Sequence, residues 1–475
     1  RDFIFNLGGD PILRIFLFAT ALLASTALPS FAADPVTTPE DQKALTLTVY
    51  QQNITLVREQ RRVTLPNGRS RLAVIGVPSA LRPETVLTNA ATPDRIRVLG
   101  QVYESALLTP EALLRASVGS TVQVVTRHPE TGVDSFAAAQ VLRAQGREAL
   151  VRMDGRIRTL DVRRIAFDNA PSNLRARPTL VLDVASNGAG AEDLTLSYLT
   201  GGLSWKTDYV ARLAEDETSI QLAGWVTITN GTETSFQDTR LRVVAGSINQ
   251  ARCPVRRQKA VPGIMAMRAD ASQELPASTA VSDLRVFDFP DTLTIRAKEK
   301  RPLALLTAAA VKVQKQYRLD GNNSGFNRLQ REVQRSSPTV RYRLEYKADT
   351  GLGRALPSGT VRLYVPSAGG DLLRGESNIR YTPVGEKATL TVGSAADITS
   401  ERRQTDFRRA GLPKNVVETA HRITLRNAKD EAVTVDVVEN IPGDWRMLEE
   451  SQPHSKRSAG QAEWEAELTY RVRTR

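Results

Sequence analysis

The sequence predicts a mainly β protein, built from several antiparallel β-sandwich modules with a small SH3-like barrel segment and few short helices. Apolar and polar residues alternate along many short segments, and Asn-Gly or Asp-Gly pairs separate some of these segments. A chain of 475 residues is also longer than one hydrophobic core normally serves. We therefore expect a modular chain of half-buried strands.

The alternation is clearest where Val340, Tyr342 and Leu344 are separated by arginines. Such a period of two is typical of a strand with one buried and one solvated face. The same pattern occurs in the segments 45–49, 220–228, 361–365 and 468–472. Tight hairpin turns are predicted at Asn67-Gly68, Asp154-Gly155 and Asn230-Gly231, because these residue types tolerate positive φ.

Residues 1–33 have the pattern of a secretory signal peptide with a doubtful start. Arg14 precedes the apolar run 15–28, which is followed by Pro29 and small residues, so cleavage is expected after Ala32 or Ala33. We therefore expect a periplasmic or extracellular protein with no transmembrane helix in the mature chain, since no apolar run reaches about 20 residues.

The mature chain divides into four expected parts. The first is an N-terminal β unit at 34–105, and the second is a short helix plus the SH3-like barrel at 106–170. A central β domain follows at 178–400 and contains a disordered or mobile basic loop at 250–283, where the alternation is lost. A C-terminal β-sandwich-like unit spans 416–475.

Two short helices are predicted. Thr109 is a suitable N-cap, and Pro110 suits the first helical position because its missing N–H would have no partner there. The second helix rests on the spacing of Phe326, Leu329 and Val333.

The formal net charge of +12 favours an anionic partner. In an exported protein, that partner is expected to be an anionic glycan or lipid, or another envelope protein, and no nucleic acid is expected. Cys253 is the only cysteine, so no internal disulfide can form.

No motif predicts catalysis, a cofactor or a metal. The three histidines, His128, His421 and His454, lie far apart without a neighbouring ligand at metal-binding spacing, and we expect them at the surface. Ser204 lacks the second glycine of a nucleophile elbow, and no phosphate-binding glycine motif occurs. A carboxylate-dependent hydrolase remains an alternative, because two carboxylates brought together by folding leave no sequence motif.

Two sets of residues are candidates for a ligand or partner surface. Tyr198, Trp205 and Tyr209 flank the Gly201-Gly202 bend and are expected either to line a groove or to pack in the core. A basic cluster of Arg256, Arg257 and Lys259 is expected either to meet an anionic partner or to be a solvated loop. Trp445 is expected to be a core residue.

The segment Gly201-Gly202-Leu203-Ser204-Trp205-Lys206-Thr207-Asp208-Tyr209 resembles the bacterial domain-of-unknown-function family 4139, which includes mucoidy-inhibitor-like proteins. The segments 383–387, 397–398 and 440–445 resemble it as well, so the resemblance covers roughly 178–475. Many relatives carry a long coiled-coil hairpin where this chain has the segment 119–167. The resemblance implies an envelope or secreted β protein and supplies no catalytic residues.

We therefore predict an exported, non-enzymatic binding or scaffolding protein. The alternatives are a hydrolase of envelope polysaccharide or peptidoglycan, and a surface-assembly protein that works by strand donation, which would require an unpaired and uncharged edge strand.

Overall fold

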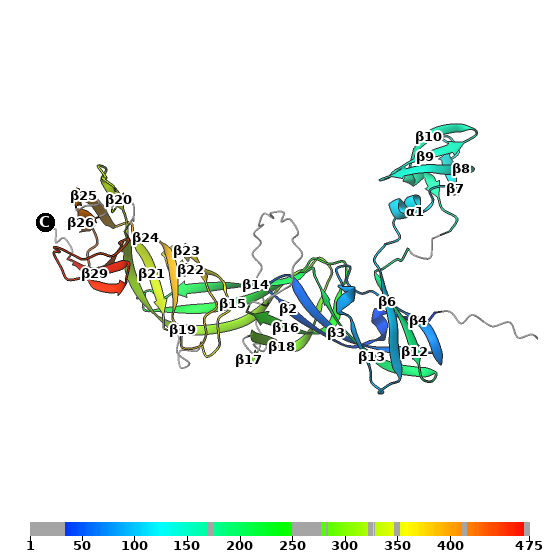
Figure 1. Ribbon diagram of the computed structural model, residues 1–475, viewed down its shortest axis with the longest axis horizontal. Helices are drawn as coiled ribbons and strands as arrows, with labels where there is room; N and C mark the ends of the chain where they lie inside the picture. The colour runs from blue at the N-terminus through cyan, green and yellow to red at the C-terminus, as the bar shows by residue number, and fades with distance from the viewer. Residues whose placement is uncertain are drawn as a thin grey trace, which may run out of the picture. The chain divides into compact units, whose positions relative to one another are not determined.

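The computed structural model describes residues 34–169, 174–246, 248, 277–281, 284–321, 326, 328–345, 352–410 and 416–469. In these residues the chain is mainly β, as predicted, with one α-helix and five sheets (Figure 1). The expected signal peptide and most of the expected loop at 250–283 lie outside them. Within the described part, no helix is long and apolar enough to cross a membrane.

Two sheets contain the N-terminal strands. The four-stranded sheet has the order β1 (Val36–Thr37), β4 (Gly68–Ile75), β12 (Thr179–Ser186) and β6 (Ile96–Glu104). The seven-stranded sheet has the order β17 (Ala277–Val281), β18 (Leu284–Ile295), β16 (Phe236–Ala245), β2 (Gln42–Tyr50), β3 (Ile54–Leu65), β13 (Gly190–Thr200) and β5 (Leu87–Ala90). Short 3-10 turns occur at Pro39–Asp41 and Pro83–Thr85.

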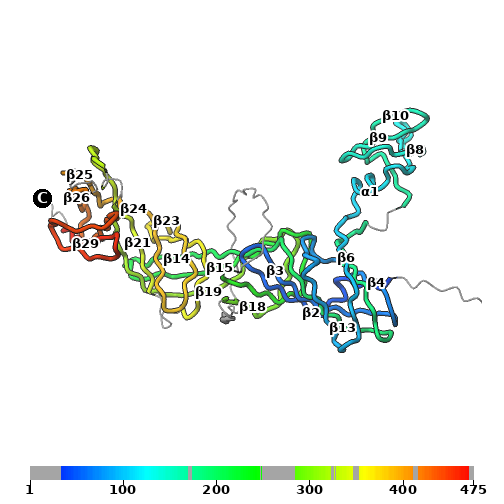
Figure 2. The backbone as a smooth tube through the Cα atoms, viewed as in Figure 1, coloured from blue at the N-terminus to red at the C-terminus, as the bar shows by residue number. Residues whose placement is uncertain are grey.

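Strand pairing crosses the boundary that we expected between residues 34–105 and the central part. β12 lies between β4 and β6, and β13 pairs with β3 along its whole length (Figure 2). β16 runs parallel to β2. The N-terminal strands are therefore completed by strands that follow the segment 106–170 in the sequence.

The predicted Thr109 helix is confirmed as α1 (Pro110–Ala116), and the Thr109 side chain accepts a hydrogen bond of 3.1 Å from the Ala112 N–H. It packs against a five-stranded antiparallel sheet in the order β10 (Arg156–Asp161), β9 (Glu148–Met153), β8 (Asp134–Gln145), β7 (Thr121–Arg127) and β11 (Ile165–Ala166). A third 3-10 turn covers Val162–Arg164.

This five-stranded sheet has its own apolar core, but the expected barrel is not closed. In the described residues no pairing joins the two edge strands, β10 and β11. The predicted turn at Asp154-Gly155 joins β9 to β10, and both residues have positive φ, 51° and 74°. This turn was therefore readable from the sequence, whereas the hairpins predicted at Asn67-Gly68 and Asn230-Gly231 are absent from the described residues, because each pair joins strands of different sheets.

The largest sheet has ten strands. Its main path is β23 (Leu372–Ile379), β22 (Gly359–Val365), β14 (Leu203–Leu213), β15 (Ser219–Asn230), β19 (Lys300–Asp320), β27 (Val433–Asn440), β29 (Gln461–Leu468) and β28 (Ser455–Ser458), with β21 (Thr339–Leu344) and β24 (Ala388–Ser394) joined beside β19. A three-stranded sheet has the order β20 (Gln334–Ser336), β25 (Ile398–Ala410) and β26 (Val416–Asn427).

Two further predictions are corrected. The four-, seven- and ten-stranded sheets are mixed rather than purely antiparallel, since β1 with β4, β16 with β2, and both β14 with β22 and β19 with β27 pair in parallel. The helix predicted around Phe326, Leu329 and Val333 is absent from the described residues of that segment. The backbone there hydrogen-bonds instead to the side chain of Gln404 in β25, through the N–H of Gln330 and the C=O of Arg328. Tertiary contacts thus replace the helical ladder.

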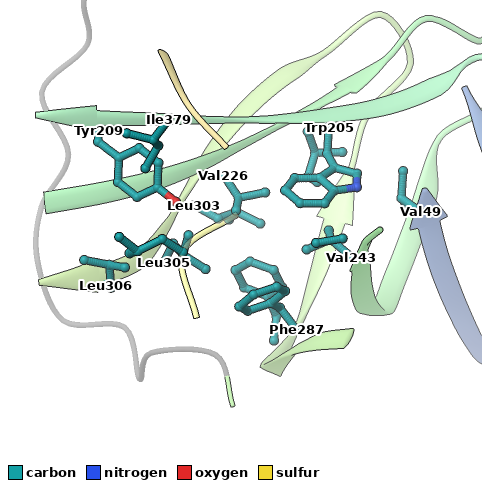
Figure 3. Close-up of a cluster of buried hydrophobic side chains, with 14 of the residues drawn as sticks. Val49, Trp205, Tyr209, Val226, Val243, Phe287, Leu303, Leu305, Leu306 and Ile379 are labelled. Carbon is teal, nitrogen blue, oxygen red and sulfur yellow. The ribbon is translucent and has the colours of Figure 1, made fainter. Parts of the chain in front are cut away.

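The main core lies between strands of the seven- and ten-stranded sheets. Figure 3 shows Val49, Val243 and Phe287 from the first sheet near Trp205 and Val226 from the second. All five side chains are buried. The alternation read from the sequence thus places one face of each of these strands in a shared core.

Candidate anion-binding face

The three aromatic residues proposed as a groove are buried in the core. Tyr198, Trp205 and Tyr209 are only 2%, 4% and 0% exposed. The Tyr209 hydroxyl donates to the Pro357 carbonyl at 2.8 Å, and the Tyr198 hydroxyl donates to Glu59 at 3.0 Å. Burial raises the pKa of Tyr198 well above its usual value. Their positions correspond to the packing interpretation, because buried rings offer no surface to a ligand.

The basic cluster Arg256, Arg257 and Lys259 lies outside the described residues, so its role as a partner surface stays a prediction. In the described part, no group of three or more histidine, cysteine, aspartate or glutamate side chains is arranged to hold a metal ion. A small depression of about 80 Å³ is lined by Arg212, Leu213, Ala214, Ser219, Gln221 and Ala309.

Four arginines share one face of the three-stranded sheet. Arg335 lies opposite Glu401 in the pairing of β20 with β25, and Arg403 lies opposite Arg422 in the pairing of β25 with β26. Alternate residues of a strand point to the same side, so Arg426 lies on this side too. We call this set the arginine face: Arg335, Arg403, Arg422 and Arg426.

The arginine face holds more positive charge than its carboxylate neutralises. Glu401 accepts from Arg335 at 3.0 Å and lies 3.6 Å from Arg426. The hydrogen bond from Arg335, followed by the charge of Arg426, lowers the pKa of Glu401. Arg403 and Arg422 are exposed, and neither has an ion-pair partner among the described residues.

Like charges directly opposite each other across two strands destabilise a sheet. The pair of Arg403 and Arg422 therefore carries a cost in the free protein that an anion bound between them would remove. Guanidinium groups offer paired N–H donors that match the oxygens of carboxylates and phosphates. The arginine face is thus chemically suited to bind an anionic partner.

The opposite face of the same sheet is anchored by a buried ion pair. Arg402 in β25 donates to both carboxylate oxygens of Glu439 in β27, at 3.0 and 3.1 Å. Both side chains are less than a tenth exposed. Gly321 leaves room for this pair, since a Cβ there would lie 2.2 Å from a Glu439 oxygen. The bidentate contact ties the three-stranded sheet to the ten-stranded sheet.

Residues 194–471 match the family described as "Domain of unknown function (DUF4139)". The chain belongs to the DUF4139 family. The resemblance seen in the sequence is therefore confirmed, and the DUF4139 region contains the arginine face and the buried pair. A comparison with curated proteins found no match.

The DUF4139 segments recognised in the sequence lie in turns and buried strands. Gly202 has a φ of +88°, and a Cβ there would lie 2.5 Å from the Thr232 side chain, so the bend between β13 and β14 requires glycine. Trp445 is half-exposed rather than a core residue. Its ring lies 5.4 Å from that of His454, which in turn lies 5.9 Å from Trp464. His454 is thus held in an aromatic cluster instead of being free at the surface.

His421 of the DUF4139 region is also half-buried, in contrast to its expected exposure. Its Nε2 lies 3.2 Å from the Thr419 hydroxyl, which donates to the Asp406 carbonyl. Nδ1 is buried without a hydrogen-bond partner in the described residues. Burial, helped by the charge of Arg402, lowers the pKa of His421 to about 4.

We expect this histidine to make the DUF4139 protein less stable in acid. Between its ordinary pKa of 6.5 and about 4, only the unfolded chain binds the proton, so stability falls as the pH drops through this window. The loss is about 2 kcal/mol, reduced from the full shift because the ring is only half-buried. Burial raises the pKa of Glu439, which has the opposite effect, so the histidine must be isolated by mutation.

The measurement compares urea midpoints of wild type and His421→Gln at pH 7 and pH 4. Glutamine keeps a polar atom near Thr419 but has no proton to bind. The variant should lose less stability than wild type between the two pH values. Parallel losses in the two proteins would show that His421 is not the group responsible.

The arginine face was not predicted from the sequence, because the part of β25 after Ser400 has too few apolar residues to indicate a strand. Strands were expected to end near Ser400 and resume at Val416, yet β25 continues to Ala410. The available signal was the four-residue spacing of Arg422 and Arg426, which places both on one side of a strand. Which arginines face one another is decided by strand register, which the sequence does not show.

Proposed function

We propose that this DUF4139 protein is a non-enzymatic binding or scaffolding protein that acts outside the cytosol and holds an anionic partner on its arginine face. The observation that carries the proposal is the opposed pair Arg403 and Arg422, which has no ion-pair partner in the described residues. The net charge of +12 supports it, because a positive protein attracts anionic surfaces over a distance.

The location is part of this proposal. The sequence of residues 1–33 supports export to the periplasm or beyond, where anionic glycans, lipid headgroups and acidic envelope proteins are the available polyanions. Fractionation of cells with an antibody to the DUF4139 region tests it. Recovery of the uncleaved chain in the cytosolic fraction would contradict it.

The finer architecture expected from the sequence is retained as a proposal as well. The segment 121–166 has the short strands, tight turns and separate small core of an SH3-like module. The packing of Phe287 and Trp205 in one core supports a sandwich of the two large sheets. Such modules would present the binding face on a rigid support.

The experiment measures binding to an immobilised acidic polysaccharide and to anionic lipid vesicles at several salt concentrations. Wild type should bind at low salt and be released as salt rises, because the contacts are electrostatic. Arg403→Ala/Arg422→Ala should weaken binding about tenfold, on the basis of up to about 1 kcal/mol for each exposed charge.

A control variant with the same loss of charge is Arg152→Ala/Arg158→Ala in the five-stranded sheet. Both residues are exposed strand arginines without an ion-pair partner in the described residues. Equal weakening by the two double variants would assign binding to net charge rather than to the arginine face. Binding of neither polyanion nor acidic peptide by wild type would remove the proposal. The hydrolase alternative stays a prediction.

A further inference from the structure

β26 is the open edge of the three-stranded sheet. It extends over twelve residues, Val416–Asn427, and in the described part of the chain it pairs with β25 alone. The other side of an edge strand presents a row of backbone N–H and C=O groups. Such a row is able to accept one more strand.

The register shows which backbone groups face the open side. The Ala428 N–H donates to the Asp397 carbonyl at 2.8 Å, next to the paired residues Ile398 and Asn427. Hydrogen-bonded and non-hydrogen-bonded pairs alternate in an antiparallel ladder. The Ala428 bond makes Asn427 and Ile398 a non-hydrogen-bonded pair, so Leu425 and Ile423, two and four residues earlier, are in such pairs as well. Their backbone N–H and C=O groups therefore point away from β25, to the open side.

The side chains beside this edge favour an acidic strand. An added strand would place alternate side chains next to Arg422, Thr424 and Arg426, on the arginine face. Carboxylates four residues apart on that strand would lie beside the two arginines of β26. Arg403 of the neighbouring strand β25 lies opposite Arg422, so its charge would add to the contact between a carboxylate and Arg422.

The same side chains disfavour a second copy of this chain in the register that brings Arg422 and Arg426 together. In an antiparallel pairing of two β26 strands centred on Thr424, Arg422 of each copy would lie opposite Arg426 of the other. Like charges at directly opposed positions are destabilising. Arginines whose only role is to prevent unwanted strand pairing are needed on the edge strand alone. Arg403 lies on the inner strand β25, so this role does not account for it.

We propose that β26 accepts an extended acidic peptide segment of a partner protein as an added β-strand. The inference rests on the proposed function, since it names the partner class of the arginine face. Backbone hydrogen bonds along Ile423 and Leu425 would provide affinity, and the pairing of carboxylates with Arg422 and Arg426 would provide selectivity.

The test uses the full mature chain and three synthetic peptides. The first has two glutamates four residues apart with β-branched residues between them. The second has lysines in place of the glutamates, and the third keeps the glutamates but has prolines that prevent strand pairing. Binding is followed by fluorescence anisotropy, and the backbone of β26 is followed by hydrogen exchange.

The first peptide should bind and slow amide exchange in β26 by about tenfold or more. The lysine and proline peptides should bind at least about tenfold more weakly. Arg422→Glu/Arg426→Glu should reverse the preference in favour of the lysine peptide. The exposed positions of both side chains make this variant compatible with folding, which circular dichroism checks.

Three outcomes would overturn the inference, and they separate it from the proposed function. Equal binding of the proline peptide, or binding of the first peptide without slower exchange in β26, would show attraction to the arginine face without strand addition. Binding of the polysaccharide but of no peptide would assign the face to a polymer. In these cases the proposed function stands, whereas binding of no anion at all removes both.

Discussion

Replacing Arg61 by methionine is expected to lower the free energy of unfolding by about 4 kcal/mol, the cost of leaving a buried charge without its partner. Arg61 is 2% exposed and donates to Glu59 at 2.8 Å and to the Ile75 carbonyl at 2.8 Å. Without the guanidinium, Glu59 would remain buried with the Tyr198 hydroxyl as its one donor among the described residues. A lower urea midpoint, followed by tryptophan fluorescence, checks this expectation.

Two controls separate the buried charge from other effects of the substitution. Arg58→Met changes an exposed arginine of the same strand and should alter stability by less than about 0.5 kcal/mol. The triple variant Glu59→Leu/Arg61→Met/Tyr198→Phe removes the three polar side chains together and should recover much of the loss. If the triple variant is no more stable than Arg61→Met, the unpaired carboxylate is not the cause.

Arg402→Met should destabilise the C-terminal part of the chain by about 3 kcal/mol for the same physical reason. The bidentate contact with Glu439 is a buried link between the three-stranded and ten-stranded sheets. Loss of this link should also speed hydrogen exchange in β25 and β26. Urea unfolding and exchange mass spectrometry together measure the two effects.

The matched substitution is Arg403→Met, one residue further along the same strand and on the exposed face. It should leave stability nearly unchanged and weaken only the binding of anions. Arg402→Met/Glu439→Leu should be more stable than Arg402→Met, because no buried charge remains. A larger loss from Arg403→Met than from Arg402→Met would refute the assignment of the two faces.

Local features of the fold were predictable where a short segment of sequence decides them. The capped helix after Thr109 and the Asp154-Gly155 turn both depend on neighbouring residues alone, and the structure contains both. The segment around Leu329 also has helical spacing, but its backbone bonds to Gln404, 74 residues away. Local propensity was overridden there by a contact that the sequence does not display.

The buried charges show a similar limit. Glu59 and Arg61 have the same parity along β3 as the buried residues Val57 and Val63, so alternation alone would have placed them inward. Charged residues are mostly solvated, so charge alone would place them on the other face. The alternation along the strand was the better guide, because Glu59 and Arg61 form an ion pair with each other inside the core.

The sequence by itself determined that this protein is mainly β, strongly basic and a member of the DUF4139 family, since strand alternation, charge and family motifs are properties of the linear chain. Only the tertiary structure decided that Tyr198, Trp205 and Tyr209 are core residues and that Arg403 and Arg422 face each other. The physical reason is register: a shift of one residue between two strands changes which side chains meet and which face the core.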